Sequence, residues 1–430
     1  MQGMKTVLAL LFMLSLPLHP SGAADTHFET NAQFEASQKA RSEGFAAFRA
    51  GDHAGALVKL EAALALRPDN SLLLGYVAYL AAETGDTPRA TEVARRYAAL
   101  GLAPGQQIQD ALEEKLPADD WAEIKAGFTA NITPQGEASI FASVPPDIAL
   151  IEGIALGPDG RLFVSSVVSG GIYAQRENGW QKLISAADRG MGSFFGIAFD
   201  ALHGSLWATY GHVDQTSGHK KGGGKTGIAE FDATTGKLKH DYVLQGSTAE
   251  HQIADLLITR DHTIYASDAS GKAVYKVADD ALIKAFDLPF STSPQGLAES
   301  AQGGLFLADY GRGLWLLDPG SGRAALLGVP RGLSLLGIDG LAARGNKLIA
   351  IQNGVNPHRV LEITLSDDGK LAANARVLAQ NLPGFDEPTL GVGVPNGYIF
   401  VAGSQWPKYG PGGTVKEGVV IQPTSLMRLP

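Results

Sequence analysis

Acidic and amide side chains recur at one position of a repeated pattern in the second part of the chain. The six copies of this position are Glu152, Phe195, Ala254, Gln295, Asp339 and Glu387. If they meet at one point, the three carboxylates crowd together, which is costly unless a cation or protons neutralise them. Carboxylate and amide oxygens are the ligands of hard divalent ions such as Ca²⁺. Because none of the six positions is His or Cys, zinc is a poorer fit.

The elements that would position these residues are six copies of a turn followed by a short apolar strand. The apolar strands begin at residues 162, 206, 264, 305, 348 and 399. Spacings of about 40 to 50 residues with hairpin turns are typical of propeller blades. The one longer spacing is accounted for by an inserted loop over 211–226. We therefore predict a six-bladed β-propeller, closed by pairing of segment 138–144 with a strand near 419–429.

The blade starts resemble those of a known family. The segments EGIA at 152–155, QGLA at 295–298 and DGLA at 339–342 each precede an apolar strand. They are similar to the blade starts of the gluconolactonase, regucalcin and senescence-marker family of six-bladed, calcium-dependent lactonases. The likeness covers about residues 145–430 and is weak outside these blade starts.

This resemblance implies a metal site with a catalytic role. In the family a Glu, an Asn and an Asp hold one divalent ion, and the Asp is the proposed base. By this likeness Glu152, Gln295 and Asp339 are the metal ligands, Asp339 is also the catalytic residue, and Glu387 lies behind the ligands. The expected ion is Ca²⁺, with Mg²⁺ or Mn²⁺ as alternatives. The chain departs from the family at Gln295, where Asn is expected, and at Ala254, where the family has an Asn near the substrate.

Loops on the same rim of a propeller are the expected substrate contacts. Arg312 could hold a carboxylate or sugar hydroxyl, and Trp406 could pack against a sugar face. For each residue of this kind a purely structural role is the alternative. Asp309, for example, could cap a turn. The predicted substrate contacts are Asp255, Asp309, Arg312, Asn353 and Trp406.

The first part of the chain is rich in Ala, Leu, Glu and Arg at helical spacing. Gly51-Asp52 recurs as Gly85-Asp86, 34 residues later, which is the period of tetratricopeptide helix pairs. The region resembles such a pair over about 37–104, with further helices to 128, although a plain helical hairpin docked on the second domain is an alternative. We expect an α plus all-β protein with a helical domain over 25–128, a linker over 129–137 and the propeller over 138–430.

The composition of the chain excludes several classes of protein function. The 430 residues carry a net charge of −9 and no cysteine. The absence of cysteine excludes thiol nucleophiles, disulfides and Cys-ligated metals, and an acidic chain is a poor partner for nucleic acid. Within 1–24, Lys5 and the apolar run 7–16 are typical of a secretory signal peptide. We therefore expect an exported protein, periplasmic or secreted, with no membrane span in the mature chain.

Two functions remain open at this stage. The first is a divalent-metal-dependent hydrolase of a sugar lactone or related ester. The alternative is a non-catalytic exported binding or scaffold protein that uses its helical repeats and the propeller surface to bind a protein partner or a ligand. If the propeller is the enzyme, deleting the helical region is expected to leave turnover largely intact.

Overall fold

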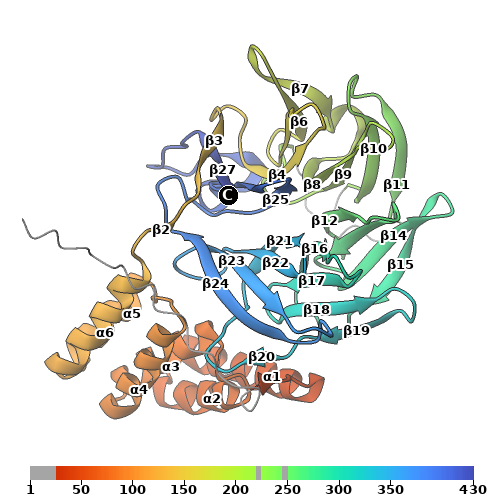
Figure 1. Cartoon of the computed structure of the whole chain (residues 1–430). Coiled ribbons are helices and arrows are strands. Elements are labelled where there is room, and N and C mark those ends of the chain that lie inside the picture. The colour runs from red at the N-terminus through yellow and green to blue at the C-terminus, as the bar shows by residue number, and fades with distance from the viewer. Residues whose placement is uncertain (1–25, 219–223, 245–249) are drawn as a thin grey trace, which may run out of the picture.

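The computed structural model describes residues 26–218, 224–244 and 250–430. The predicted signal peptide lies outside the described residues. Within these ranges six α-helices are followed by six small sheets arranged around an axis, so the expected α plus six-bladed β-propeller class is confirmed (Figure 1). In the described part of the chain, no helix has the length and apolarity needed to cross a bilayer. The helices are α1 (Asn31–Arg49), α2 (His53–Leu66), α3 (Ser71–Glu83), α4 (Thr87–Ala99), α5 (Gln106–Lys115) and α6 (Ala118–Asn131).

The repeated Gly-Asp pairs end one helix and begin the next. Gly51 and Gly85 have positive φ angles of 79° and 84°, which glycine adopts without steric cost. Asp52 and Asp86 then cap the first turns of α2 and α4 by accepting hydrogen bonds from backbone amides. The expected helix pairs are therefore present, and their assignment to the tetratricopeptide class stays a prediction.

Each blade is a four-stranded antiparallel sheet, and blade 5 carries one extra strand, β2 (Gln135–Gly136), at its outer edge. The strands of blades 1 to 3 are β4 (Ile151–Leu156), β5 (Leu162–Ser166), β6 (Gly171–Arg176) and β7 (Gly179–Ser185); β8 (Ser193–Asp200), β9 (Ser205–Gly211), β10 (Gly227–Asp232) and β11 (Leu238–Val243); and β12 (Ile253–Ile258), β13 (Ile264–Asp268), β14 (Ala273–Ala278) and β15 (Ala281–Asp287). Those of blades 4 to 6 are β16 (Pro294–Glu299), β17 (Leu305–Asp309), β18 (Gly313–Asp318) and β19 (Arg323–Leu326); β21 (Ile338–Arg344), β22 (Lys347–Gln352), β23 (Arg359–Leu365) and β24 (Ala372–Gln380); and β25 (Gly391–Val394), β26 (Gly397–Val401), β27 (Thr424–Leu429) and β3 (Ser139–Val144).

The ring closes as the sequence predicts. Strand β3, which precedes blade 1 in the chain, pairs with the C-terminal strand β27, with Val144 opposite Thr424. A two-residue strand, β1 (Thr26–His27), pairs separately with β20 (Val329–Pro330). The last blade is thus built from both ends of the propeller sequence, which leaves no gap between blades 6 and 1.

A β-bulge interrupts the innermost strand of blades 1 to 5. In blade 1, Ile151 and Ile154 pair with Ser166 and Val164, so two residues face one on β5. The same shift occurs in β8, β12, β16 and β21. Bulges re-aim side chains, and here the two bulged residues lie at the axis. The bulged pairs are Glu152-Gly153, Phe195-Gly196, Ala254-Asp255, Gln295-Gly296 and Asp339-Gly340.

The glycines of these bulges permit close contact between blades. A Cβ atom on Gly153 would lie 2.3 Å from the carbonyl oxygen of Phe195 in the next blade, and one on Gly340 would lie 2.4 Å from that of Thr389. Such distances are shorter than any real contact, so a larger residue would push the blades apart. The Gly after Glu152 and Asp339 is therefore part of the bulge rather than of a turn.

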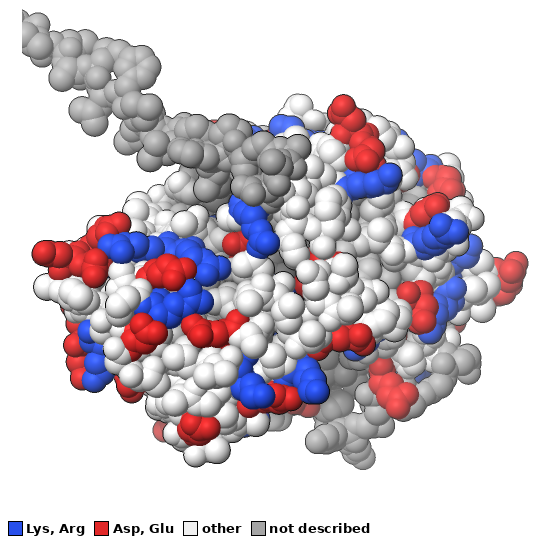
Figure 2. All heavy atoms as spheres, turned by 90° about the horizontal axis from the view of Figure 1, so that it is seen from below, with Lys and Arg blue, Asp and Glu red and all other residues white. Residues whose placement is uncertain are grey.

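The helices dock on the propeller beside blades 4 and 5 (Figure 1). Glu29 forms ion pairs with Arg67, in the segment after α2, and with Arg312 of blade 4, with N–O distances of 2.5 and 2.8 Å. Asn356 of blade 5 and Ala103 after α4 exchange two hydrogen bonds. Figure 2, a view from the side of the helices, shows acidic and basic side chains interspersed over the described residues of that face.

Candidate functional site

The bulged strands surround a cavity of about 320 Å³ at one mouth of the channel. All six positions singled out in the sequence line it, so the structure brings together the predicted metal ligands Glu152, Gln295 and Asp339 and the predicted neighbour Glu387. The lining residues are Glu152, Phe195, Val213, Gln252, Ala254, Asp255, Ala269, Gln295, Tyr310, Asp339, Asn353, Glu387, Leu390 and Trp406.

Glu152 is held by an indole. Trp406 Nε1 donates a hydrogen bond of 2.7 Å to Glu152 Oε2. Burial in the channel, together with the negative charge of Asp339, raises the pKa of Glu152 well above its ordinary value, and the Trp406 hydrogen bond only partly offsets this. Trp406, predicted as a substrate contact, therefore lines the mouth and also fixes a carboxylate.

Asp339 belongs to a short chain of hydrogen bonds. Asn353 Nδ2 donates to Asp339 Oδ2 at 2.7 Å and to the carbonyl oxygen of Pro388 at 2.9 Å. Tyr310 Oη in turn donates to Asn353 Oδ1 at 3.0 Å. Burial raises the pKa of Asp339 to about 6, although the Asn353 hydrogen bond favours the charged form. Asn353 thus faces the cavity as predicted, with its amide nitrogen committed to orienting Asp339.

Gln295 presents an amide at the same mouth. Its Nε2 donates a hydrogen bond of 2.8 Å to Ser293 Oγ. Because the nitrogen is engaged there, the carbonyl oxygen is the end available to a cation.

Asp255 occupies the bulge position that is glycine in the four other bulged strands. Gly196 of blade 2 makes room for it, since a Cβ there would lie 2.5 Å from Asp255 Oδ1. Asp255 lines both the mouth cavity and a second cavity of about 370 Å³ farther along the channel. Burial raises its pKa to about 7, in spite of hydrogen bonds from the backbone amides of Leu256 and Leu297.

Glu387 lies before β25 rather than on it. Its φ angle of 64° is in the left-handed region, a conformation that costs a non-glycine residue roughly 1 kcal/mol or more. Its backbone N–H donates to His358 Nδ1 at 3.2 Å, and its Oε2 is buried without a hydrogen-bond partner. Burial and the charge of Asp339 raise the pKa of Glu387 to about 7.

The mouth is therefore strongly acidic. Four carboxylates line it, and no Lys, Arg or His is among its described lining residues. No three of these carboxylates bring their oxygens within 4.8 Å of one another in the part of the chain that the structure describes. The arrangement is a wide acidic ring rather than a closed cage, and it requires protons or a cation to neutralise it.

Two predicted substrate contacts lie elsewhere. The Arg312 side chain is fully buried, paired with Glu29 and stacked on the rings of Phe34 and Trp315 at 4.3 and 5.1 Å. Asp309 caps the neighbouring loop by accepting hydrogen bonds from the Thr292 and Gly311 amides. Neither lines the mouth, because each side chain is used to hold the loops of blade 4. Asp255, Asn353 and Trp406 do line it.

Some lining residues gave no signal in the sequence. Val213, Ala269 and Leu390 are apolar residues of rim loops, and nothing in their type distinguishes them from core residues. Gln252 could have been found, since it directly precedes the inner strand β12. A further cleft of about 390 Å³ adjoins the mouth through Tyr310 and is lined by Gln38 and Arg41 of α1 and by Arg67 after α2.

No protein-family model and no curated protein matches the chain. Solved structures match parts of the chain. They include the aldose sugar dehydrogenase of Streptomyces coelicolor in its PQQ-bound form, at 15% identity, with 69% of this chain and 99% of that chain covered and a TM-score of 0.47. A candidate gluconolactonase matches at 16% identity, 68% and 91% coverage and a TM-score of 0.45.

The virginiamycin B lyase of Staphylococcus aureus matches at 13% identity, 62% and 82% coverage and a TM-score of 0.45. The names of these structures describe different activities, and similarity at this level does not identify a function.

Proposed function

We propose that the chain is a divalent-cation-dependent hydrolase of a sugar lactone or related ester, acting at the mouth cavity. The observation that carries the proposal is the set of four carboxylates around one cavity without a basic side chain, with the buried Glu387 Oε2 unpaired. Such a set is stable at neutral pH only if something positive lies among it. A bound cation would neutralise the carboxylates and could also take part in the hydrolysis.

The donor set fits a hard cation. Glu152 and Asp339 offer carboxylate oxygens and Gln295 offers an amide oxygen, which is the chemistry that Ca²⁺ accepts and that Mg²⁺ or Mn²⁺ accept less flexibly. The open width of the ring favours Ca²⁺, which tolerates variable geometry and several water ligands. Bound there, such an ion would polarise a carbonyl group and lower the pKa of a water molecule.

The protein's own groups supply the remaining functions. Asp339 has a pKa of about 6, so it is largely ionised at neutral pH and basic enough to accept a proton from an attacking water. Asn353 and Tyr310 fix its orientation. Trp406 holds the Glu152 carboxylate by its indole N–H, and the apolar Phe195, Val213 and Leu390 limit the water around the reacting ester.

Calorimetric titration of Ca²⁺ into chelator-treated protein is the first test. We expect one saturable site, weakened at least tenfold in Glu152→Gln because one carboxylate ligand is lost. The matched control is Glu299→Gln, at the far end of the inner strand β16 from Gln295, and it should bind as the wild type does. If the wild type takes up none of Ca²⁺, Mg²⁺ and Mn²⁺, the proposal is wrong.

Hydrolysis of a panel of sugar lactones and simple esters, followed by acid release, tests the reaction itself. We expect cation-dependent turnover, and a fall in kcat of about 100-fold or more in Asp339→Asn, since general-base catalysis typically contributes that much. The Glu299→Gln control should keep its kcat. Cation binding without turnover on any member of the panel would instead support the binding-protein alternative.

A further inference from the structure

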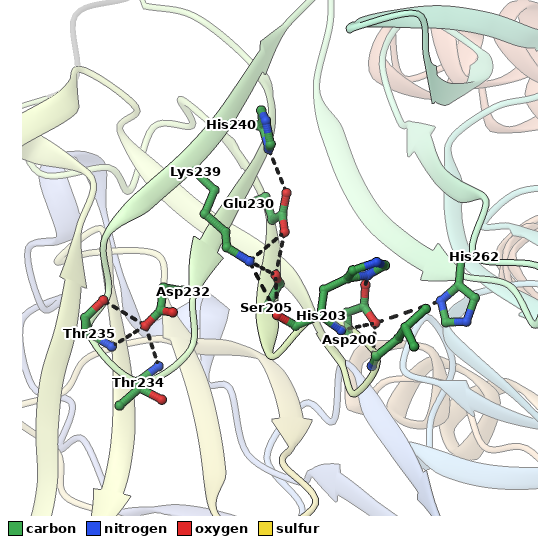
Figure 3. Close-up of polar contacts among 11 residues, drawn as sticks. Asp200, His203, Ser205, Glu230, Asp232, Thr234, Thr235, Lys239, His240 and His262 are labelled. Carbon is green, nitrogen blue, oxygen red and sulfur yellow. Dashed lines mark hydrogen bonds and ion pairs between the residues drawn. The ribbon is translucent and has the colours of Figure 1, made fainter.

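A second group of metal-binding side chains lies at the opposite rim of the propeller. Asp200 is the last residue of β8, and His203 lies in the turn that leads to β9. His262 lies in the corresponding turn of blade 3, between β12 and β13. The inner strands run from the mouth to these turns, so the three residues are separate from the acidic ring. Figure 3 shows the three side chains facing one another across the boundary between the blades.

The geometry is close to that of a metal site. His203 Nδ1 lies 2.7 Å from Asp200 Oδ2, and His262 Nδ1 lies 3.9 Å from Asp200 Oδ1. One ligand atom from each of the three residues lies within 4.8 Å of the other two. The Asp200 side chain is 4% exposed, whereas those of His203 and His262 are 57% and 45% exposed. The carboxylate is thus fixed, and the imidazoles have room to close on an ion.

The Asp200 carboxylate is ready for a cation. It accepts hydrogen bonds from the backbone amides of Leu202 and His203, at 2.9 and 3.4 Å. Both of its oxygens face histidine nitrogens, Oδ2 that of His203 and Oδ1 that of His262.

His262 stands where the matching turns have glycine. In blade 3 the Thr259 amide donates to the Thr263 carbonyl and the His262 amide to the Thr259 carbonyl. The turns of blades 1 and 4 have the same two backbone hydrogen bonds, with Gly160 and Gly303 at the position of His262. All three residues have positive φ angles, of 80°, 85° and, for His262, 63°.

A side chain at this position has a conformational cost that glycine avoids. Strain of this kind is retained where the side chain has a use. The ordinary hydrogen-bonded pair of Asp200 and His203 does not need His262. A metal ion shared by all three residues would use it.

We propose that Asp200, His203 and His262 bind a transition-metal ion of the zinc class and thereby join blade 2 to blade 3. Two imidazoles and one carboxylate are a ligand set that Zn²⁺ accepts, and the exposed side of the site leaves a position for water. Zn–N distances of about 2.0 Å require His262 to approach by a small rotation. Ca²⁺, which takes oxygen ligands, would not bind here.

The test uses the full chain without a polyhistidine tag, stripped with chelator and titrated with Zn²⁺ and with Co²⁺. We expect a saturable Zn²⁺ site, a rise in Tm on binding, and a visible Co²⁺ absorption band. His262→Gly should weaken Zn²⁺ binding at least tenfold and remove the band. Because glycine suits this turn, the variant should melt, without metal, at the same temperature as the wild type or higher.

His240→Ala is the matched control. His240 is a 56% exposed histidine of blade 2 that pairs with Glu230, outside the three-residue group. The His240→Ala variant should bind Zn²⁺ with unchanged affinity, whereas His203→Ala should bind Zn²⁺ more weakly. Equal Zn²⁺ affinity in the wild type and His262→Gly, or no saturable binding in the wild type, would overturn the proposal. A Ca²⁺ titration should give the same result in His262→Gly and the wild type.

Discussion

The chelator-treated protein should lose stability as the pH rises from about 5 to 8. Burial raises the pKa of Asp255 to about 7, of Asp339 to about 6 and of Glu387 to about 7. In the unfolded chain such groups titrate near 4. Between these values the folded state holds protons that the unfolded state has released, so stability is full below about pH 4 and falls as the pH approaches 7.

The expected loss of folding stability with rising pH is large. For Asp255 alone the shift from 3.8 to about 7 corresponds to about 4 kcal/mol at most. Asp255→Asn keeps the shape and removes the charge, so at pH 8 it should stabilise the metal-free protein by about 2–4 kcal/mol. The measurement is a series of thermal melts with chelator from pH 5 to 8. Glu362, whose pKa is held at about 2 by Arg376, Lys347 and Arg344 against the effect of burial, stays ionised throughout this range.

The control for this series is Asp287→Asn, an exposed carboxylate beside Lys284, which should leave the slope unchanged. Adding Ca²⁺ should flatten the pH dependence, because a cation then neutralises the ring. An Asp255→Asn protein that is no more stable than the wild type at pH 8 would contradict the electrostatic account of the mouth.

Glu29→Gln should cost about 3–5 kcal/mol and release the helices from the propeller. The side chains of Glu29 and Arg67 are each 8% exposed, and that of Arg312 is fully buried. Removing the carboxylate leaves two guanidinium charges in the domain junction without their counter-ion. The loss of the Glu29 carboxylate is costly because water cannot hydrate either guanidinium group in the buried junction.

Urea unfolding and limited proteolysis of the segment after α6 measure this effect. The control is Glu43→Gln, whose ion pair with Lys59 is 42% to 50% exposed on the helical surface and should contribute little to stability, because solvent screens it. If Glu29→Gln is no less stable than Glu43→Gln, the junction does not depend on the buried triad.

The sequence predicted the ring, the closing strand and the inner positions because each depends on local patterns. Turn spacing gave six blades, and the repeated EGIA-like segments mark bulges that bring residues such as Glu152 and Asp339 to one cavity. Which residues bind a cation or substrate stays a prediction, and the same holds for the identity of the ion.

What could not be predicted depends on contacts between distant segments. Arg312 pairs with Glu29, 283 residues earlier in the chain, and no local pattern reveals such a partner. The raised pKa of Asp255 likewise follows from its enclosure by neighbouring blades. The sequence suggested that the helical region could be deleted without loss of turnover. In the structure it packs on the loop that carries Tyr310, and Tyr310 supports Asn353 and Asp339, so deletion should impair the mouth.

The closing pair β3–β27 also sets the order of assembly. Its partners are about 280 residues apart in the chain, and contacts of such long sequence separation form slowly. The helices depend on contacts between residues close in sequence, so each can form as soon as its residues have been synthesised. The ring can be completed only after β27 has been synthesised, so a shorter nascent chain leaves blade 6 open, with β3 as an unpaired edge.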